Sequence, residues 1–495
     1  MFQGTGSDVG KSTLVAGLCR IAMRRGISVA PFKPQNMSNN AAACPDGGEI
    51  GRSQALQAQA CGLEPNIDFN PVLLKPQSDQ MAQVIVHGKA LNSVSARQYM
   101  TTQRAQLKDA VMQSFTRLKN QFDLVLVEGA GSPAEINLRR HDIANMGFAR
   151  SADVPVCLIG DIDRGGVIAA IAGTQAVIDT NDAKQIKSFV INRLRGDPTL
   201  FDDGLKAIET LTSWPSRGVL PWIDAALRLP QEDAVVLDSW HNTENDNVGS
   251  GQRENSAIHI AVPMLSRIAN FDDLDPLRAE SDVKVSFVAP GKTIPQEADA
   301  LIIPGTKSTI ADLNFLREQG WDHDIIVAAR QGKRVTGLCG GYQLLGNSIN
   351  DEHGLEGRRL IVDGLGLLDI HTRMQPSKHV GQTAAICARS LQTVSGYEIH
   401  IGETEGPDSK KPFLINFSNE TGKIDGAINS AGNVDGTYLH GIFANDEFRH
   451  WWLNSVKSRH ASKLDYTTFV EQQLNSLADY MENQLDIDGL LDDAA

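Results

Sequence analysis

The chain has 495 residues, which predicts two or three domains, and its 41% hydrophobic content is typical of a globular protein. The formal net charge of -14 argues against nucleic acid as a main partner, and no apolar run approaches the length of a membrane span. Six cysteines without C-x-x-C pairs argue against a zinc site and a disulfide framework, so we expect a cytoplasmic location. The oligomeric state is left open.

A phosphate-binding loop opens the chain: residues 4–13 read GTGSDVGKST and precede an apolar helical pattern. Backbone amides of such a loop cradle phosphates, the lysine neutralises the outer ones, and the serine hydroxyl holds Mg²⁺. The expected ATP-binding residues are Gly6, Asp8, Gly10, Lys11, Ser12 and Thr13. Thr5 takes the place of the usual first glycine, which points to the P-loop branch that activates small carboxylates. Only residues 1–3 precede the loop, so we expect a clipped first strand and an internal start.

Up to about residue 225, short β-branched runs alternate with helical segments, which predicts a mostly parallel sheet. The expected strands cover residues 28–31, 124–127, 155–159 and 188–191. Ligands bind beyond the carboxyl ends of such strands, so the loops there define the site. Glu128 ends a very apolar strand, and we expect it to bind Mg²⁺ with Ser12, because a buried carboxylate without a partner is costly. Glu49 and Asp46 compete equally for a further metal role.

Residues 238–256 are rich in Asn, Glu, Ser and Gly and lack periodicity, which predicts a linker. A second α/β series follows, with strands expected at residues 258–262, 283–287, 300–303 and 334–336. The predicted fold class is therefore α/β with two doubly wound domains. The first domain covers residues 1–237 and the second residues 257–450, followed by C-terminal helices and an acidic tail in residues 451–495.

A cysteine elbow follows the last of these strands, where residues 337–341 read GLCGG. The pattern G-x-C-x-G is the cysteine form of the strained turn that lifts a nucleophile out of an α/β sheet. Its glycines give the permissive backbone and the room that this turn needs. We expect Cys339 to be the nucleophile, with a thiol pKa lowered by the helix that follows, and His440 to be its base. This pair predicts acyl transfer through a thioester.

Both motif sets, in this order and along nearly the whole chain, resemble the cobyric acid synthase family. The N-terminal half carries QGTGSDVGKS (3–12), PFKPQNM (31–37), NPVLLKP (70–76), VEGAGSPAEINLR (127–139), DIDRGG (161–166) and NRLRGD (192–197). The C-terminal half carries PGTKST (304–309), GLCGGYQLLG (337–346), GYEIHIGET (396–404) and GTYLHG (436–441). Each motif alone is modest support, and their combination is highly specific.

The resemblance implies an enzyme with two sites. The C-terminal domain resembles class I glutamine amidotransferases, which hydrolyse glutamine to glutamate and ammonia. The N-terminal domain is similar to dethiobiotin synthetase and would phosphorylate a corrinoid carboxylate with ATP. The implied acceptor is adenosylcobyrinic acid a,c-diamide, amidated on its b, d, e and g side chains. An acyl phosphate supplies the leaving group that a carboxylate lacks, and ammonia made inside the enzyme stays unprotonated.

The resemblance also implies roles for single residues. Gly305 and Gly340 would serve the oxyanion hole and glutamine site, and Asn192 would read the adenine edge. The candidates for the glutamine pocket are Gln343, Tyr397, Glu398 and His400, each of which can equally be structural. The candidates for corrinoid contact are Lys33, Arg139, Asp142 and Arg164, although a solvated surface charge explains each of the basic ones nearly as well. Most class I enzymes carry a glutamate two residues after the histidine, and Ile442 stands there, which predicts a Cys–His dyad.

Two further hypotheses stay open. A cobyrinic acid a,c-diamide synthase, or the related enzyme that amidates a cell-wall lipid precursor, shares both domain types. The NPVLLKP and EINLR segments favour the first hypothesis, and the absence of paired cysteines for zinc disfavours the cell-wall enzyme. A P-loop switch of the chromosome-partitioning type has a similar loop, but it needs no cysteine elbow, and an acidic chain suits DNA poorly.

Overall fold

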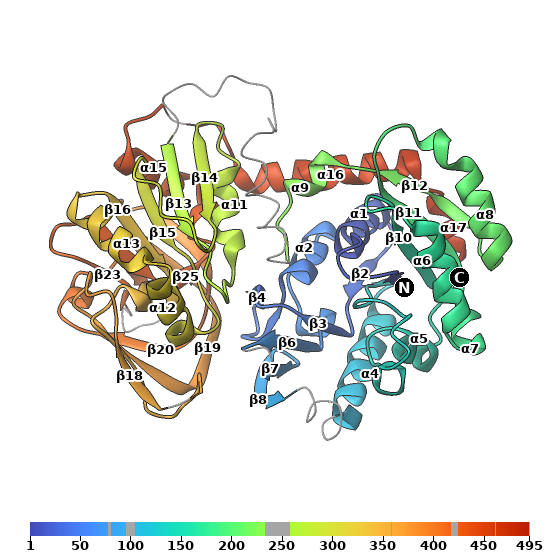
Figure 1. Cartoon of the computed structure of the whole chain (residues 1–495), viewed down its shortest axis with the longest axis horizontal. Coiled ribbons are helices and arrows are strands. Elements are labelled where there is room, and N and C mark those ends of the chain that lie inside the picture. Colours follow the sequence, from blue (N-terminus) through green and yellow to red (C-terminus); the bar gives the residue numbers. More distant parts are fainter. Residues whose placement is uncertain are drawn as a thin grey trace.

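The computed structural model describes residues 1–77, 81–95, 104–232, 258–357, 359–416, 424–460 and 462–494. These residues form two lobes that lie side by side (Figure 1). The N-terminal lobe contains the described residues up to 232 and the last two helices, and the C-terminal lobe contains those from 258 to 456. The predicted linker at residues 238–256 lies outside the described residues.

Parallel strands form the centre of the N-terminal lobe. β2 (Val29–Phe32) pairs with β9 (Leu124–Val127), and a parallel bridge between Phe2 and Glu128 joins this pair to a four-stranded sheet. That sheet has the order β1 (Phe2–Gly4), β10 (Val156–Asp161), β11 (Ile186–Leu194) and β12 (Ser216–Pro221). The helices of this part are α1 (Lys11–Arg24), α2 (Arg52–Ala60), α4 (Arg104–Gln121), α5 (Met146–Ala152), α6 (Val167–Val177), α7 (Thr180–Ala183), α8 (Asp202–Thr212) and α9 (Asp224–Leu227). The strands predicted from the β-branched runs are confirmed, because strands covered on both faces need such side chains.

A smaller sheet that the sequence did not predict lies on the side of this lobe that faces the C-terminal lobe (Figure 1). It consists of β3 (Gln35–Met37), β6 (Val72–Pro76), β7 (Met81–Val86) and β8 (Lys89–Ser95), with the hairpin β4 (Ala41–Ala43) and β5 (Glu49–Gly51) beside it. Ala41, Leu73 and Ile85 of this region pack against Ile399 of the other lobe. An apolar cluster therefore joins the two lobes.

The C-terminal lobe contains two sheets. The first is parallel except at β23 and has the order β14 (Val283–Val288), β13 (Ile258–Pro263), β15 (Ala300–Ile303), β16 (Arg334–Leu338), β24 (Val434–Thr437) and β23 (Ala427–Ile428). The second, mostly antiparallel, contains β18 (Leu360–Asp363), β17 (Ser348–Asp351), β19 (His371–Cys387), β20 (Thr393–Glu405) and β25 (Leu439–His440), with β21 (Leu414–Asn416) and β22 (Ile424–Asp425) at its side. The helices are α11 (Asp275–Arg278), α12 (Thr309–Glu318), α13 (Trp321–Arg330), α14 (Gly340–Leu344) and α15 (Asp446–Val456).

The last two helices, α16 (Tyr466–Gln484) and α17 (Ile487–Asp492), return to the N-terminal lobe (Figure 1). Leu474, Leu477 and Met481 share one apolar cluster with the buried face of α1. An ion pair of 2.7 Å between Arg20 and Glu471 flanks this contact. The end of the chain therefore supports the helix that follows the phosphate-binding loop. Among the described residues, no helix has the length and apolar character needed to span a membrane.

Truncating the buried face of α16 is predicted to destabilise the N-terminal lobe. Leu477 is fully buried, so Leu477→Ala leaves a cavity against α1 and lowers the free energy of unfolding by about 2–5 kcal/mol. Urea unfolding followed by tryptophan fluorescence measures the change. The exposed neighbour Ser476→Ala is the control, and equal stabilities for the two variants would contradict the packing role of α16.

Candidate active sites

Cys339 lies in a strained turn between β16 and α14. Its φ of 50° and ψ of -108° fall in a region that residues other than glycine rarely adopt, as a nucleophile elbow requires. The Cys339 N–H donates to the Thr437 carbonyl at 2.8 Å and fixes the turn against β24. A Cβ at Gly341 would lie 2.0 Å from the Ile303 carbonyl oxygen, so a side chain there would displace the backbone. The glycines after the cysteine thus allow α14 to pack tightly against β15.

His440, at the end of β25, interacts with Cys339 through its side chain. Its Nδ1 donates to Oδ2 of Asp273 at 2.7 Å, and the Gly441 N–H donates to Oδ1 of the same carboxylate at 2.6 Å. Burial works to lower the pKa of His440, but the Asp273 carboxylate and the neighbouring Cys339 raise that pKa well above its ordinary value. An imidazole that keeps its proton at neutral pH stabilises a thiolate beside it.

The Cys–His dyad expected from the sequence therefore has a third member in the structure. Asp273 follows a left-handed turn at Asn270 and reaches His440 from a segment 167 residues earlier in the chain. The usual position two residues after the histidine holds Ile442, which is buried in the apolar core. The residues near His440 in the sequence do not reveal Asp273, because this carboxylate comes from the segment Phe271–Leu274 after β13.

The two glycines expected at the oxyanion hole lie close to the elbow. A Cβ at Gly305 would lie 3.2 Å from Cε1 of His440, and one at Gly340 would lie 2.5 Å from Cγ2 of Thr306. The 304–306 loop, the first turn of α14 and the imidazole therefore meet at one place. A side chain larger than that of glycine would not fit at either position, and Cys339 itself is buried, with 8% exposure.

The four expected glutamine-pocket residues surround this point, and each has protein partners. Gln343 accepts from the Thr309 hydroxyl at 3.0 Å and donates to the Tyr438 hydroxyl at 3.0 Å. The Tyr397 ring stacks on His440, with 5.3 Å between centroids. Glu398 and His400 contact each other at 3.3 Å, and the imidazole also stacks on Tyr438. These contacts fix the four side chains near Cys339 and His440.

Burial works to raise the pKa of the Glu398 carboxyl, but hydrogen bonds from His379 and His400 and their charge hold it well below its ordinary value. The carboxylate also accepts from the Thr383 hydroxyl at 3.0 Å. Glu398 is therefore an ionised acceptor for His379, His400 and Thr383.

The phosphate-binding loop has the conformation that its glycines predict. Gly10 has a φ of 87°, and Asp8 has a φ of 53° and pairs with Arg193 at 2.9 Å. Lys11 donates to the Gly6 carbonyl at 2.9 Å, within the loop. Asn192, expected at the adenine edge, donates to the Val9 carbonyl at 2.8 Å and so holds the loop from β11. Thr13 is the third residue of α1, directly after Lys11 and Ser12.

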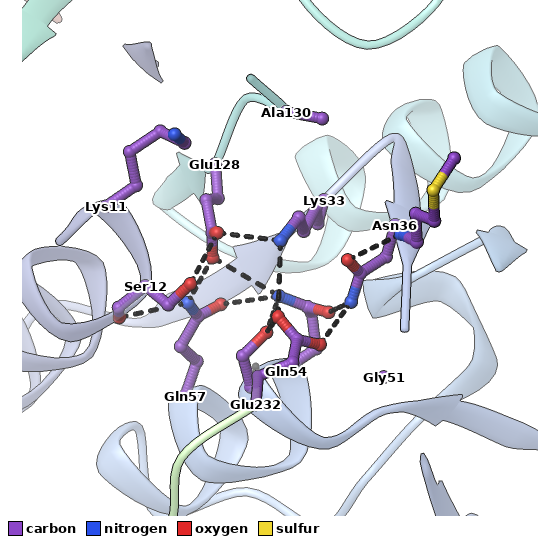
Figure 2. Close-up of polar contacts among 12 residues, drawn as sticks. Lys11, Ser12, Lys33, Asn36, Gly51, Gln54, Gln57, Glu128, Ala130 and Glu232 are labelled. Carbon is purple, nitrogen blue, oxygen red and sulfur yellow. Dashed lines mark hydrogen bonds and ion pairs between the residues drawn. The ribbon is translucent and has the colours of Figure 1, made fainter. Parts of the chain in front are cut away.

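Glu128 is the centre of a buried polar cluster at the end of β9 (Figure 2). Its Oε1 accepts from the Ser12 hydroxyl at 2.7 Å and from the Lys33 ammonium at 2.8 Å. Its Oε2 accepts from the amides of Gln57 at 2.6 Å and Gln54 at 3.3 Å. Burial works to raise the pKa of Glu128, and these donors together hold it below its ordinary value. The carboxylate is therefore ionised beside the hydroxyl of the phosphate-binding loop.

Glu232 is a member of this cluster that the sequence analysis missed. Its carboxylate accepts from the Ser53 hydroxyl at 2.8 Å and from the Asn36 amide at 2.5 Å, and it pairs with Lys33 at 3.5 Å (Figure 2). Lys33 is thus paired with two carboxylates of the protein. No signal in the sequence pointed to Glu232, because this residue lies in no motif and is about a hundred residues away from Glu128 in the chain.

Glu49, for which the sequence suggested a further metal role, lies outside the cluster of Ser12 and Glu128. It is fully buried, and its carboxylate accepts from Lys75 at 3.0 Å and from Lys378 of the other lobe. Two ammonium groups satisfy both oxygens, so Glu49 binds the lobes together. The competing candidate, Asp46, accepts only a long contact of 3.4 Å from the Gly48 N–H among the hydrogen bonds of the described residues.

The corrinoid candidates differ in their surroundings. Arg139 makes a two-pronged pair with Asp182, at 2.5 and 2.8 Å, which occupies its guanidinium. Asp142 accepts from three backbone N–H groups, including that of Gly147 at 2.7 Å, and so shapes the start of α5. Arg164 is exposed in the loop after β10. Of these three, only Arg164 presents its charge to solvent without a carboxylate among the described residues.

Comparison with known proteins places this arrangement in a family. Residues 1–236 match the CobQ/CobB/MinD/ParA nucleotide binding domain, and residues 259–448 match the CobB/CobQ-like glutamine amidotransferase domain. The cobyric acid synthase of Hyphomonas neptunium is 57% identical over 99% of this chain and 96% of its own length. The cobyric acid synthases of Paracoccus denitrificans and Rhodobacter capsulatus are 57% and 56% identical, over 99% of this chain and 98% of theirs. The chain belongs to the cobyric acid synthase family.

Membership in this family confirms the resemblance and the α/β fold class with an N-terminal nucleotide-binding and a C-terminal amidotransferase domain. It makes the chain a glutamine-dependent amide ligase of cobalamin biosynthesis. The two domain matches support the use of ATP and of glutamine. The full-length match to cobyric acid synthases also favours the first hypothesis over the diamide synthase, the cell-wall enzyme and the chromosome-partitioning switch.

Replacing Asp273 by asparagine is predicted to lower the kcat of glutamine hydrolysis by about 10²–10⁴-fold, because the imidazole loses its orientation and its charge partner. The pKa of His440, which the carboxylate raises, must then fall. Since activity requires the protonated imidazole, the alkaline limb of the pH–rate profile moves to lower pH in Asp273→Asn. Initial rates of glutamate release across the pH range measure both effects. A variant with unchanged kcat and limb would contradict the role of Asp273.

Proposed function

We propose that this chain catalyses the ATP- and glutamine-dependent amidation of the b, d, e and g carboxylates of adenosylcobyrinic acid a,c-diamide. The observation that carries the proposal is the pairing of two sites in one chain. One is the strained Cys339 turn beside His440 and Asp273, and the other is the phosphate-binding loop beside Glu128. Nitrogen released at the first site would be installed at the second.

Glutamine hydrolysis follows from the geometry of the first site. The Cys339 thiolate attacks the side-chain amide carbon of glutamine, and backbone N–H groups near Gly305 and Gly340 stabilise the developing oxyanion. His440 gives its proton to the departing nitrogen, so ammonia leaves and a thioester forms. Water, deprotonated by the same imidazole, then hydrolyses the thioester to glutamate. Asp273 holds Nδ1 of the ring, so that Nε2 gives up and regains the proton on the side of the cysteine.

Carboxylate activation belongs to the second site. The corrinoid carboxylate attacks the terminal phosphorus of ATP, ADP leaves, and ammonia then displaces phosphate from the acyl phosphate to give the amide. Lys11 neutralises charge on the outer phosphates. Asn192 fixes the loop that binds them. The oxygen of a free carboxylate is a poor leaving group in neutral water. Phosphorylation is needed because it turns this oxygen into part of a phosphate, which leaves readily.

The donor set at the second site fits Mg²⁺, a hard cation that prefers oxygen ligands. The Ser12 hydroxyl and the ionised Glu128 carboxylate would hold it, at the point where the phosphates of ATP reach the loop. The ion would neutralise phosphate charge when bound. Lys33 now occupies the same carboxylate oxygen as Ser12, so its ammonium would have to turn towards another anion. A substrate carboxylate or phosphate fits that need.

Arg164 is the best supported of the corrinoid contacts, since it is exposed beyond the carboxyl end of β10 and lies outside the ion pairs of the described residues. Arg139 and Asp142 support the site indirectly, because their partners fix the segment between β9 and α5. A role for Arg139 in direct contact would require its pair with Asp182 to open.

Separate inactivation of the two sites tests the proposal. Cys339→Ala is expected to abolish glutamine-dependent amidation and to leave amidation with added ammonium salt within about twofold of the parent, because the nucleophile acts only on glutamine. Glu128→Gln is expected to abolish amidation from both nitrogen sources, while glutamine hydrolysis persists. Mass spectrometry of the corrinoid counts the amides formed, since each replaces a hydroxyl by an amino group.

The exposed Glu64→Gln serves as the matched control in the same lobe. The proposal fails if Cys339→Ala keeps glutamine-dependent amidation, or if the parent protein forms no amide on the corrinoid diamide with ATP and either nitrogen source.

A further inference from the structure

The turn that presents Asp273 belongs to the C-terminal lobe, yet its polar groups are held from the N-terminal lobe. Asn270 begins this turn in the left-handed region, with φ 54° and ψ 40°. Its backbone N–H donates to Oδ1 of Asn40 at 2.6 Å, and its side-chain amide donates to the Ala41 carbonyl at 2.9 Å. Both asparagines are almost fully buried, at 2% and 4% exposure, so these bonds are shielded from water.

A second contact holds the other side of the same turn. Nε of Arg52, the first residue of α2, pairs with Oδ2 of Asp272 at 2.9 Å. Arg52 is itself fixed to the segment of Asn40, since its N–H donates to the Asn40 carbonyl at 3.1 Å. The residues before and beside Asp273 are therefore attached to one small region of the N-terminal lobe.

Asn270 also reaches the imidazole by a second route. Its amide donates to the Tyr397 hydroxyl at 2.8 Å, and the Tyr397 ring is stacked on His440. The ring and the carboxylate contact different parts of the imidazole, one its face and the other its Nδ1. The position of Asn270 therefore affects both groups that hold the His440 ring, Tyr397 and Asp273.

The opposite end of Asn40 contacts the ATP-site cluster. Its Nδ2 donates to the Glu232 backbone carbonyl at 2.5 Å. The Glu232 side chain is bound by Ser53 and by Lys33, and Lys33 contacts Glu128 (Figure 2). One buried amide is therefore bonded at one end to the segment that orients His440 and at the other to the group around the proposed Mg²⁺ ligand.

We propose that Asn40 is a positioning residue for glutamine hydrolysis: through Asn270 it fixes Asp273 and Tyr397 around His440, and through Glu232 it links that geometry to the ATP site. The inference rests on the function proposed above and adds its regulation. Release of ammonia is then fastest when the ATP site is filled, because ligands that reorder Lys33 and Glu232 act on the Asn40 side chain. A site that releases ammonia only beside an activated carboxylate avoids losing it to water.

Three variants test this role. Asn40→Ala removes the acceptor for the Asn270 N–H and is expected to lower the kcat of glutamine hydrolysis about 10- to 100-fold, as a small misplacement of a catalytic group does. Its alkaline limb is expected to move to lower pH, in the direction expected for Asp273→Asn. Asn40→Asp keeps the acceptor for the Asn270 N–H and loses the donor to Glu232, so its stimulation by ATP with the corrinoid diamide is expected to fall more than its basal rate. Asn66→Ala, at an exposed turn of the same lobe, is the control.

A variant of the partner residue covers the case in which Asn40→Ala does not fold. Asn270→Gly keeps the left-handed backbone without strain and removes the bonds to Ala41 and Tyr397, so the same fall in kcat is expected. The two substitutions together are expected to cost less than the product of their separate effects. Parental kcat, pH profile and ATP stimulation in Asn40→Ala and Asn270→Gly would overturn the inference. Absence of glutamine hydrolysis in the parent protein would instead overturn the proposed function.

Discussion

A buried carboxylate that holds an imidazole is the interaction on which the chemistry of this structure depends. Asp273 accepts from both His440 and the Gly441 N–H, so it fixes the ring and the chain that carries it. The carboxylate also keeps the imidazole charged against the effect of burial, which by itself would discharge it. In the proposed mechanism this protonated ring lies beside the nucleophilic cysteine, and the later steps use the ammonia that glutamine hydrolysis releases.

The second site solves the same electrostatic problem with different groups. Glu128 stays ionised in the interior because hydroxyl, ammonium and amide donors surround it. Both oxygens of this carboxylate already accept hydrogen bonds from the protein, so the proposed Mg²⁺ and substrate would have to exchange partners with the cluster. The interface between the lobes follows the same rule: Glu49 is held by Lys75 from its own lobe and by Lys378 from the other.

The local parts of this architecture were predictable from the sequence. The phosphate-binding loop and the cysteine elbow are short segments whose glycines report directly on backbone conformation, and the parallel strands have the β-branched runs that double burial requires. Asp273 and Glu232 were not predictable in this way. Each reaches its partner from a distant part of the chain, and nothing in the neighbouring residues distinguishes it from an ordinary surface carboxylate.

The same reasoning applies to charged residues near a motif and to the C-terminal helix. Charged residues near a motif, such as Arg139 and Glu49, invite assignment to the ligand, but pairing within the protein is decided by tertiary contacts. The segment after residue 450 was expected to be helical, and α16 is a helix. Its docking on α1 was not predictable, because the partner of its apolar face lies more than four hundred residues away in the chain.

The most direct test of the account is the origin of the nitrogen in the product. Glutamine carrying a heavy nitrogen isotope in its side-chain amide is supplied with ATP and the corrinoid diamide, in the presence of unlabelled ammonium at equal concentration. The account predicts that the new corrinoid amides carry the heavy isotope, as read by mass spectrometry. Amides that take up only unlabelled nitrogen would contradict it.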